Sequence, residues 1–157
     1  MAEQSVIHST FVIERTYPAT PERVFAAFAD PAQKRRWFIE GDHHEIEHYD
    51  MDFRVGGQEH AALRFAEGHP LTGIGCINET FYQDIVPNRR LVFSQTMSLG
   101  QKHISASLAT IELLPSGKGT NLICTHQGAF FEGSDGPERR QAGWEKLLDK
   151  LTTQFAS

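Results

Sequence analysis

The sequence predicts a single domain of the α+β class, in which an antiparallel sheet of about seven strands is covered by one long C-terminal helix. Three observations support this fold class. Seven segments carry the residue pattern of strands, and turns rich in Gly, Pro and Asn separate most of them. Two short helix signals follow the first strand. The C-terminal segment repeats apolar residues at helical spacing, and 157 residues are enough to bury a core between the two layers.

The first strand is expected at residues 10–17, where apolar side chains share one face at a period of two: Phe11, Ile13 and Tyr17. Two helix starts follow, each marked by a capping side chain directly before a proline: Thr20-Pro21 and Asp30-Pro31. The first short helix carries an apolar stripe that includes Val24 and Phe28. The second is expected to end near Trp37.

The next strand pattern alternates apolar and charged side chains before two glycines: Tyr49, Met51, Phe53 and Val55 against Asp50, Asp52 and Arg54. This alternation predicts a strand with one buried face, entered through a polar loop at residues 40–45. Turn residues then separate five further expected strands: 58–66, 71–86, 89–98, 103–114 and 120–130. Because short turns join consecutive strands, the sheet is expected to be antiparallel.

The last element differs in kind from the strands. Apolar residues here recur at spacings of three and four: Trp144, Leu147, Leu148, Leu151 and Phe155. This spacing predicts an amphipathic helix over residues 138–155, about 27 Å long at 1.5 Å per residue. Asp135 is a candidate cap at its N-terminus. The apolar stripe of this helix and the apolar face of the sheet are expected to cover each other.

Residues 44–48 read His-Glu-Ile-Glu-His, which matches the H-E-x-x-H motif of zinc peptidases. That chemistry requires a helix, on which residues four apart lie about 5–6 Å apart at Cβ and can share one zinc ion. On a strand the two histidines would lie ~13 Å apart at ~3.3 Å per residue. Since the segment continues into a strand pattern, with Ile46 and His48 on its polar side, we expect no metal site and no peptidase activity.

Composition argues against several other classes of function. The net charge is −5, and Lys and Arg are scattered rather than gathered into the basic stripe of a nucleic-acid-binding protein. The N-terminal residues lack a signal-peptide pattern, and no apolar run approaches the length of a membrane span. Cys76 and Cys124 lie far apart in apolar stretches, which favours buried, reduced thiols in a cytoplasmic protein. No motif for a nucleotide is present, and no cofactor is expected.

Five motifs occur in order along the chain: ATPERVFAAFADPAQKRRWF, MDFRVGGQ, IVPNRRLVFS, GKGTNLICTHQG and AGWEKLLDKL. Together they resemble the START-like, Bet v 1-like helix-grip proteins of the SRPBCC superfamily. The pattern is most similar to the branch named for homologues of the activator of the heat-shock-protein-90 ATPase. The resemblance implies one START-like domain over residues 1–157, with an ordered core at about 10–155. It also implies a curved sheet that grips the C-terminal helix, with a cavity between them for an apolar small molecule.

The period-two patterns indicate which side chains face this cavity. Three small residues in succession, Ser105, Ser107 and Ala109, share the inward phase of their strand and would leave volume beneath the helix. Neighbouring inward phases, the short-helix lid and the C-terminal helix complete the predicted ligand-binding set: Trp37, Phe53, Phe93, Gln95, Ser105, Ser107, His126, Trp144 and Leu148. A mainly apolar set with few polar groups is typical of a small-ligand site. Each aromatic residue also fits an ordinary core.

Two polar residues leave alternatives open. His126 fits a general base or an orienting group in the cavity, but a neutral, hydrogen-bonded histidine near a strand end is the preferred interpretation. Arg15 shares the phase of Phe11 and Ile13. It could receive a ligand carboxylate, pair with a glutamate on a neighbouring strand, or point to solvent.

Three functions remain for such a domain. The preferred one is binding of a small apolar or aromatic ligand without catalysis. The second is a cyclase- or hydrolase-like activity in the same cavity, with His126 as base. The third is a chaperone-associated module, as the family name implies, but charges of mixed sign and the lack of a separate binding domain within 157 residues give it little support. A homodimer is left open.

Overall fold

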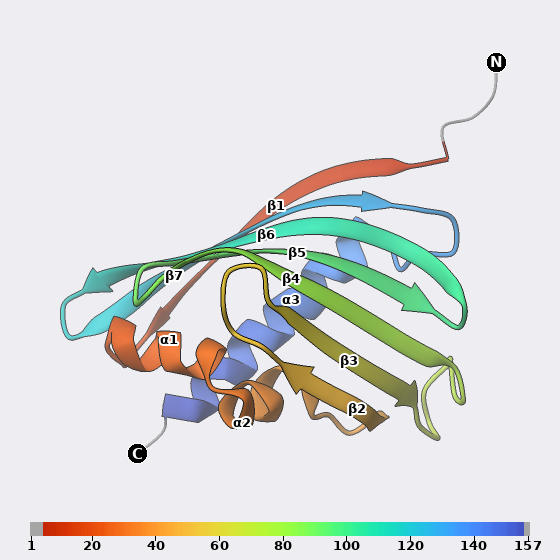
Figure 1. Ribbon diagram of the computed structural model, residues 1–157, viewed down its shortest axis with the longest axis horizontal. Coiled ribbons are helices and arrows are strands. Elements are labelled where there is room, and N and C mark those ends of the chain that lie inside the picture. The colour runs from red at the N-terminus through yellow and green to blue at the C-terminus, as the bar shows by residue number, and fades with distance from the viewer. Residues whose placement is uncertain (1–4, 156–157) are drawn as a thin grey trace.

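The computed structural model describes residues 5–155, and within this range seven strands form one antiparallel sheet (Figure 1). The strands are β1 Ile7–Tyr17, β2 His44–Met51, β3 Gln58–Phe65, β4 Gly75–Val86, β5 Arg90–Leu99, β6 Lys102–Ser116 and β7 Gly119–Phe130. Their order in the sheet is β1-β7-β6-β5-β4-β3-β2. From β2 to β7 each strand therefore lies beside the next one in sequence, whereas β1 pairs with β7 and forms one edge of the sheet. The predicted α+β fold with about seven antiparallel strands is confirmed.

Short helical segments between β1 and β2, and a long helix after β7, complete the described part of the chain: α1 Pro21–Ala29, α2 Pro31–Lys34, η1 Arg35–Ile39, α3 Pro137–Leu151 and η2 Thr152–Phe155. The two predicted helix starts are confirmed. The side chain of Thr20 accepts a hydrogen bond from the backbone N–H of Arg23, and that of Asp30 accepts one from Ala32. α2 runs directly into η1, a single π-helical turn.

The long helix differs from its expectation at both ends. Its N-cap residue is Gly136, which has no side chain to cap with, so the prediction of Asp135 as the cap is wrong. The Asp135 carboxylate instead accepts hydrogen bonds from Arg140, one turn into the helix. At the C-terminal end the α-helix stops at Leu151, and η2 continues it as a tighter 3₁₀ turn.

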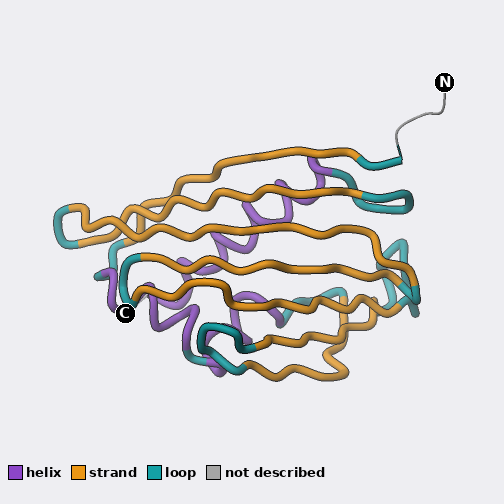
Figure 2. The backbone as a smooth tube through the Cα atoms, turned by 45° about the horizontal axis from the view of Figure 1, so that its top comes forward, coloured by secondary structure: helices purple, strands orange, loops and turns teal. Residues whose placement is uncertain are grey.

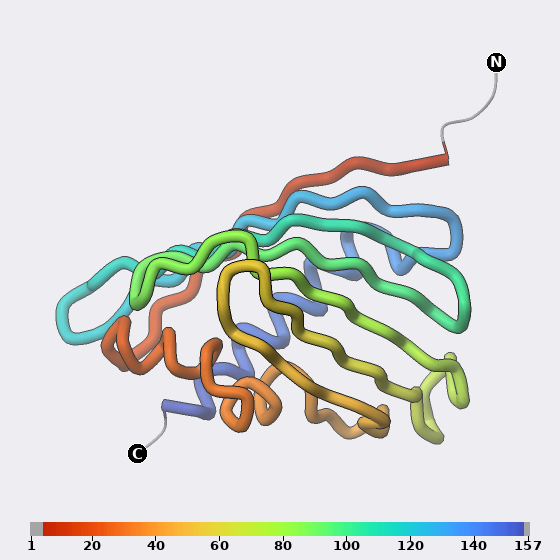
Figure 3. The backbone as a smooth tube through the Cα atoms, viewed as in Figure 1, coloured from red at the N-terminus to blue at the C-terminus, as the bar shows by residue number. Residues whose placement is uncertain are grey.

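The helix α3 crosses one face of the curved sheet diagonally, as both views of the backbone show (Figures 1 and 2). The Tyr17 hydroxyl donates to the carbonyl oxygen of Leu148 at 2.7 Å, which ties β1 to the helix inside the core. The C-terminal end of α3 lies beside the short helices (Figure 3). There Gln154 accepts hydrogen bonds of 3.2 Å from Arg23 and from Arg36.

Side chains from the sheet, α3 and the short helices form one apolar core. Its large members include Phe11, Ile13, Tyr17, Val24, Phe28, Trp37, Tyr82, Leu91, Phe93, Ile111, Leu122, Trp144, Leu148 and Leu151. The indole Nε1 of Trp37 donates to the carbonyl oxygen of Ala27 at 2.8 Å, so its polar atom is satisfied although the side chain is fully buried. Cys76 and Cys124 are buried free thiols, as predicted. Among the described residues, no helix has both the length and the apolar character needed to cross a membrane.

The strand β2 spans His44–Met51, whereas the alternation placed it at residues 49–55. A bulge between Ile46 and His48 shifts the register against β3. The extra residue puts Ile46 on the half-buried side, so its placement on the polar side was wrong.

The turn between β2 and β3 requires a glycine at position 57. A Cβ there would lie 2.1 Å from the carbonyl oxygen of Asp52.

The His-Glu-Ile-Glu-His segment lies on this strand and not on a helix. The Nε2 of His44 donates to the carbonyl oxygen of Ile39, and Nε2 of His48 lies 2.5 Å from the carboxylate of Asp50. The two histidines thus have separate partners. Within residues 5–155 no three His, Cys, Asp or Glu side chains are grouped so that they could hold a metal ion.

Candidate functional site

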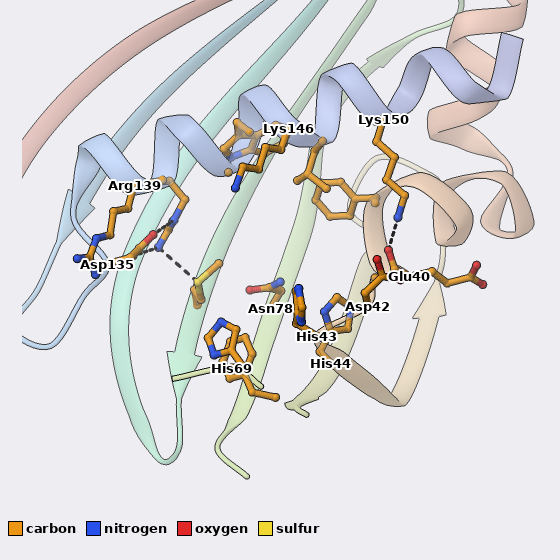
Figure 4. Close-up of a pocket in the computed structure, with 18 of the residues that line it drawn as sticks. Glu40, Asp42, His43, His44, His69, Asn78, Asp135, Arg139, Lys146 and Lys150 are labelled. Carbon is orange, nitrogen blue, oxygen red and sulfur yellow. Dashed lines mark hydrogen bonds and ion pairs between the residues drawn. The ribbon is translucent and has the colours of Figure 1, made fainter. Parts of the chain in front are cut away.

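A cavity of about 510 Å³ lies between α3, which lines it from Arg139 to Lys150, and the concave face of β3, β4 and β5 (Figure 4). Its volume falls within the range of small-molecule pockets. One wall is apolar and is made by Phe38, Phe65, Met97, Trp144 and Leu147. Three imidazoles also line the cavity: His43 from the loop between η1 and β2, His44 at the start of β2, and His69 from the turn between β3 and β4.

The floor of the cavity follows from the register of the sheet. Gln95 and Met97 of β5 point into the cavity, and they pair with Ser107 and Ser105 of β6 on one side. On the other side Asn78 of β4 pairs with Met97 and also lines the cavity. The neighbouring β6 residues are therefore two serines, and the guanidinium of Arg140 from α3 lies over one of them, Ser105.

Arg140 is the most buried charged residue of the lining, with its side chain 6% exposed. Its Nε and Nη2 each lie 2.9 Å from an oxygen of Asp135, and Nη2 also donates to the Ser105 hydroxyl at 2.9 Å. Burial alone would raise the pKa of Asp135, but the hydrogen bonds and the charge of Arg140 outweigh burial, so the pKa is lowered. The third nitrogen, Nη1, is buried and has no hydrogen-bond partner among the described residues.

His126 lies outside the cavity lining, deep in the core. Its ring stacks on Phe11 with centroids 4.5 Å apart and an interplanar angle of 4°, and Trp144 and Phe130 lie close by. Both ring nitrogens are buried without a partner in the described part of the chain. Burial, and next the positive charge of Arg140, lower the pKa of His126 to about 4. The ring is therefore neutral near pH 7, without the hydrogen bond expected of a structural histidine.

The structure divides the predicted ligand-binding set. Gln95 and Trp144 line the cavity. Ser105 does not line it but holds Arg140, and Ser107 is half-buried, with its hydroxyl 3.5 Å from the backbone oxygen of Gln95. The remaining aromatic and aliphatic members pack in or against the core: Trp37, Phe53, Phe93 and Leu148. The lining thus includes more of the polar side of α3, and more of the loop between η1 and β2, than the alternation indicated.

Several lining residues carried no recognisable signal in the sequence. Arg140 belongs to none of the five motifs, and residues 40–45 were expected to form only a polar loop. Arg15, by contrast, was a candidate for a ligand carboxylate. Its Nε lies 2.7 Å from the carboxylate of Asp149 on α3, and neither residue lines the cavity.

A buried charge cluster lies against the apolar wall. The Nζ of Lys34 is 2.5 Å from the carboxylate of Glu59 and 4.7 Å from the ring centre of Phe38, and both charged side chains are at most 3% exposed. The hydroxyls of Tyr49 and Tyr82 donate to the same carboxylate. Burial, together with the negative charge of Glu59, raises the pKa of both tyrosines, so they remain neutral donors. This cluster fixes η1, and with it Phe38, against the sheet.

A curved antiparallel sheet that grips a C-terminal helix, with a cavity between the two, defines a helix-grip protein of the SRPBCC type. A family model confirms the more specific resemblance. The chain belongs to the family described as Activator of Hsp90 ATPase homolog 1-like protein, whose model matches residues 18–156.

Solved structures with the same fold cover nearly the whole chain. The Mll3558 protein from Rhizobium loti is 49% identical, with 96% of this chain and 99% of that chain covered and a TM-score of 0.85. A protein from Rhizobium leguminosarum is 36% identical, with coverages of 96% and 95% and a TM-score of 0.87. The CV1439 protein from Chromobacterium violaceum is 26% identical, with coverages of 92% and 94% and a TM-score of 0.74. No curated protein matches the chain significantly.

Proposed function

We propose that this protein binds a small, largely apolar molecule in the cavity between α3 and the sheet, and that it holds the molecule without transforming it. The observation that carries the proposal is the cavity itself, with a volume of about 510 Å³ and an apolar wall of three aromatic rings, Met97 and Leu147. Ligand binding against such a wall is favoured by about 25 cal/mol for each Å² of apolar surface that it removes from water.

The two amide side chains on the floor support orientation of a ligand rather than chemistry. Gln95 and Asn78 offer amide groups to the floor, and amides bind ligand oxygens and N–H groups without reacting with them. The family includes proteins that bind hydrophobic ligands and others that activate the Hsp90 ATPase. The cavity between α3 and the sheet favours the first of these roles for this chain.

The enzymatic alternative depended on His126 as a general base, and the position of this residue argues against that role. A general base must reach the proton that it removes, directly or through one water. His126 does not line the cavity, and its pKa of about 4 makes it a weak base near neutral pH. We therefore assign no catalytic role to His126.

The proposal is tested by filling the cavity from the helix. Gly143 lines the cavity, and a Cβ built there meets no atom within 4 Å, so a side chain can begin at this position without a clash. Ala142 is its exposed neighbour and does not line the cavity, which makes Ala142→Trp the matched control for Gly143→Trp. Fatty acids, flavonoids and aromatic polyketides are screened by native mass spectrometry and thermal shift.

We expect at least one of these classes to bind the unmodified protein with one molecule per chain. Gly143→Trp should abolish this binding, whereas Ala142→Trp should retain it. If both variants bind as well as the unmodified chain does, the ligand occupies another site and the proposed function is wrong.

A further inference from the structure

We infer that the natural ligand carries a carboxylate, and that this carboxylate binds on the α3 side of the cavity, between Arg140 and Lys146. This inference rests on the proposed function and adds the chemical class of the ligand. It starts from the charges that line the cavity. Four basic residues, Arg139, Arg140, Lys146 and Lys150, face three acidic residues, Glu40, Asp42 and Asp135. The chain as a whole has the opposite balance, with 15 basic against 20 acidic residues.

Most of the basic residues that line the cavity are also not paired with the acidic residues that line it. Arg139 and Lys146 form no ion pair with any described residue, and Lys150 donates to a backbone oxygen, that of Glu40. The carboxylate of Glu40 is itself paired with Arg35, which does not line the cavity. Figure 4 shows Arg139, Lys146 and Lys150 along α3 on one side of the space, with Asn78 and His69 on the other. The local field therefore favours an anion.

Arg140 gives this preference for an anion a specific binding group, its buried guanidinium. A surface lysine is hydrated and binds an anion weakly, but Arg140 has already lost its water, with only 6% of its side chain exposed. Asp135 and Ser105 satisfy Nε and Nη2, whereas Nη1 has no partner. A buried donor without an acceptor is costly, and a carboxylate oxygen is the strongest acceptor that a ligand can offer to a guanidinium.

Asp135 sets how readily Arg140 engages a ligand. Because Nη1 is shielded from solvent, the guanidinium must turn toward the cavity before a ligand can reach this nitrogen. The two hydrogen bonds from Asp135 oppose that movement. Asp135 and an acidic ligand therefore compete for the same cation, and removal of the Asp135 charge should strengthen binding of the acid.

A matched pair of probes separates this inference from the proposed function. Naphthoic acid and its primary amide, naphthamide, share the same apolar body and differ in charge at the head group. Titration calorimetry on the full chain near neutral pH should give the acid at least tenfold tighter binding than the amide. Arg140→Gln and Lys146→Gln should each reduce binding of the acid severalfold and leave the amide nearly unchanged, whereas Asp135→Asn should tighten the acid.

Lys118→Gln is the control, because it removes the same charge from the exposed turn between β6 and β7 and should change neither affinity. If Arg140→Gln fails to fold, the opposite effects expected for Lys146→Gln and Asp135→Asn still decide the question. Equal binding of acid and amide would refute the carboxylate site and leave the apolar cavity standing. Binding of neither probe would count against both proposals.

Discussion

Replacement of His126 by phenylalanine should make the protein less sensitive to acid. The folded state keeps this imidazole neutral, because burial and the nearby Arg140 lower its pKa from 6.5 to about 4. Between these two pH values the unfolded chain binds a proton at this residue and the folded chain does not. The contribution of His126 to the free energy of unfolding is thus fully present above pH 6.5 and is lost as the pH falls toward about 4.

The size of the effect follows from the two pKa values. A tenfold change in an equilibrium constant corresponds to about 1.4 kcal/mol, so a pKa lowered from 6.5 to about 4 corresponds to a loss of roughly 3 kcal/mol. Near neutral pH the variant should be as stable as the unmodified protein, or more stable by up to about 2 kcal/mol, because it removes two buried nitrogens that lack partners. A phenyl ring also preserves the stacking on Phe11.

Urea unfolding followed by tryptophan fluorescence, at several pH values from neutral to about 4, measures this difference. Other groups titrate in the same range, so the quantity of interest is the gap between the His126→Phe variant and the unmodified protein. That gap should widen by roughly 3 kcal/mol on acidification. His103→Gln changes an exposed histidine of β6 and is expected to follow the unmodified protein. Parallel loss of stability in His126→Phe and the unmodified protein would refute the reasoning, as would a variant that fails to fold.

Two further predictions concern ion pairs that differ in burial. Lys34→Met should lower the free energy of unfolding by about 3–5 kcal/mol, because it leaves the Glu59 carboxylate buried without its cation. The double variant Lys34→Met/Glu59→Gln should cost less than the sum of the single changes in urea unfolding, and additive costs would show that the pair is not coupled. Arg15→Ala should cost less than about 1 kcal/mol, since its partner Asp149 has 67% of its side chain exposed. A larger loss would mean that this contact between β1 and α3 is more than a surface ion pair.

Local patterns in the sequence were enough to predict the elements of the fold. The caps at Thr20 and Asp30 act within three residues of themselves, so they can be read without knowledge of distant contacts. The spacing of apolar residues from Trp144 to Phe155 likewise reflects the helical repeat alone. Motifs along residues 10–155 then indicated the family, and the family model confirmed it.

The details of β2 depended on pairing with β3. A period-two count assumes one residue for each step along the strand, and the bulge beside Ile46 adds a residue that no alternation reveals. The same limit applies to the cavity, where sequence phase placed Phe93 and Leu148 in the ligand set. Packing in three dimensions put both in the core, and only Gln95 and Trp144 of that set reached the lining.

The sequence by itself determined the order of helices and strands and the two apolar faces that pack together, because those properties depend on residues close to one another in the chain. Only the tertiary structure decided which charges are buried and where the cavity opens. Lys34 meets Glu59 across 25 residues, and Arg140 meets Ser105 across 35. Contacts of this range depend on sheet register and on the placement of α3, and burial then changes the energy of each charge by removing its water.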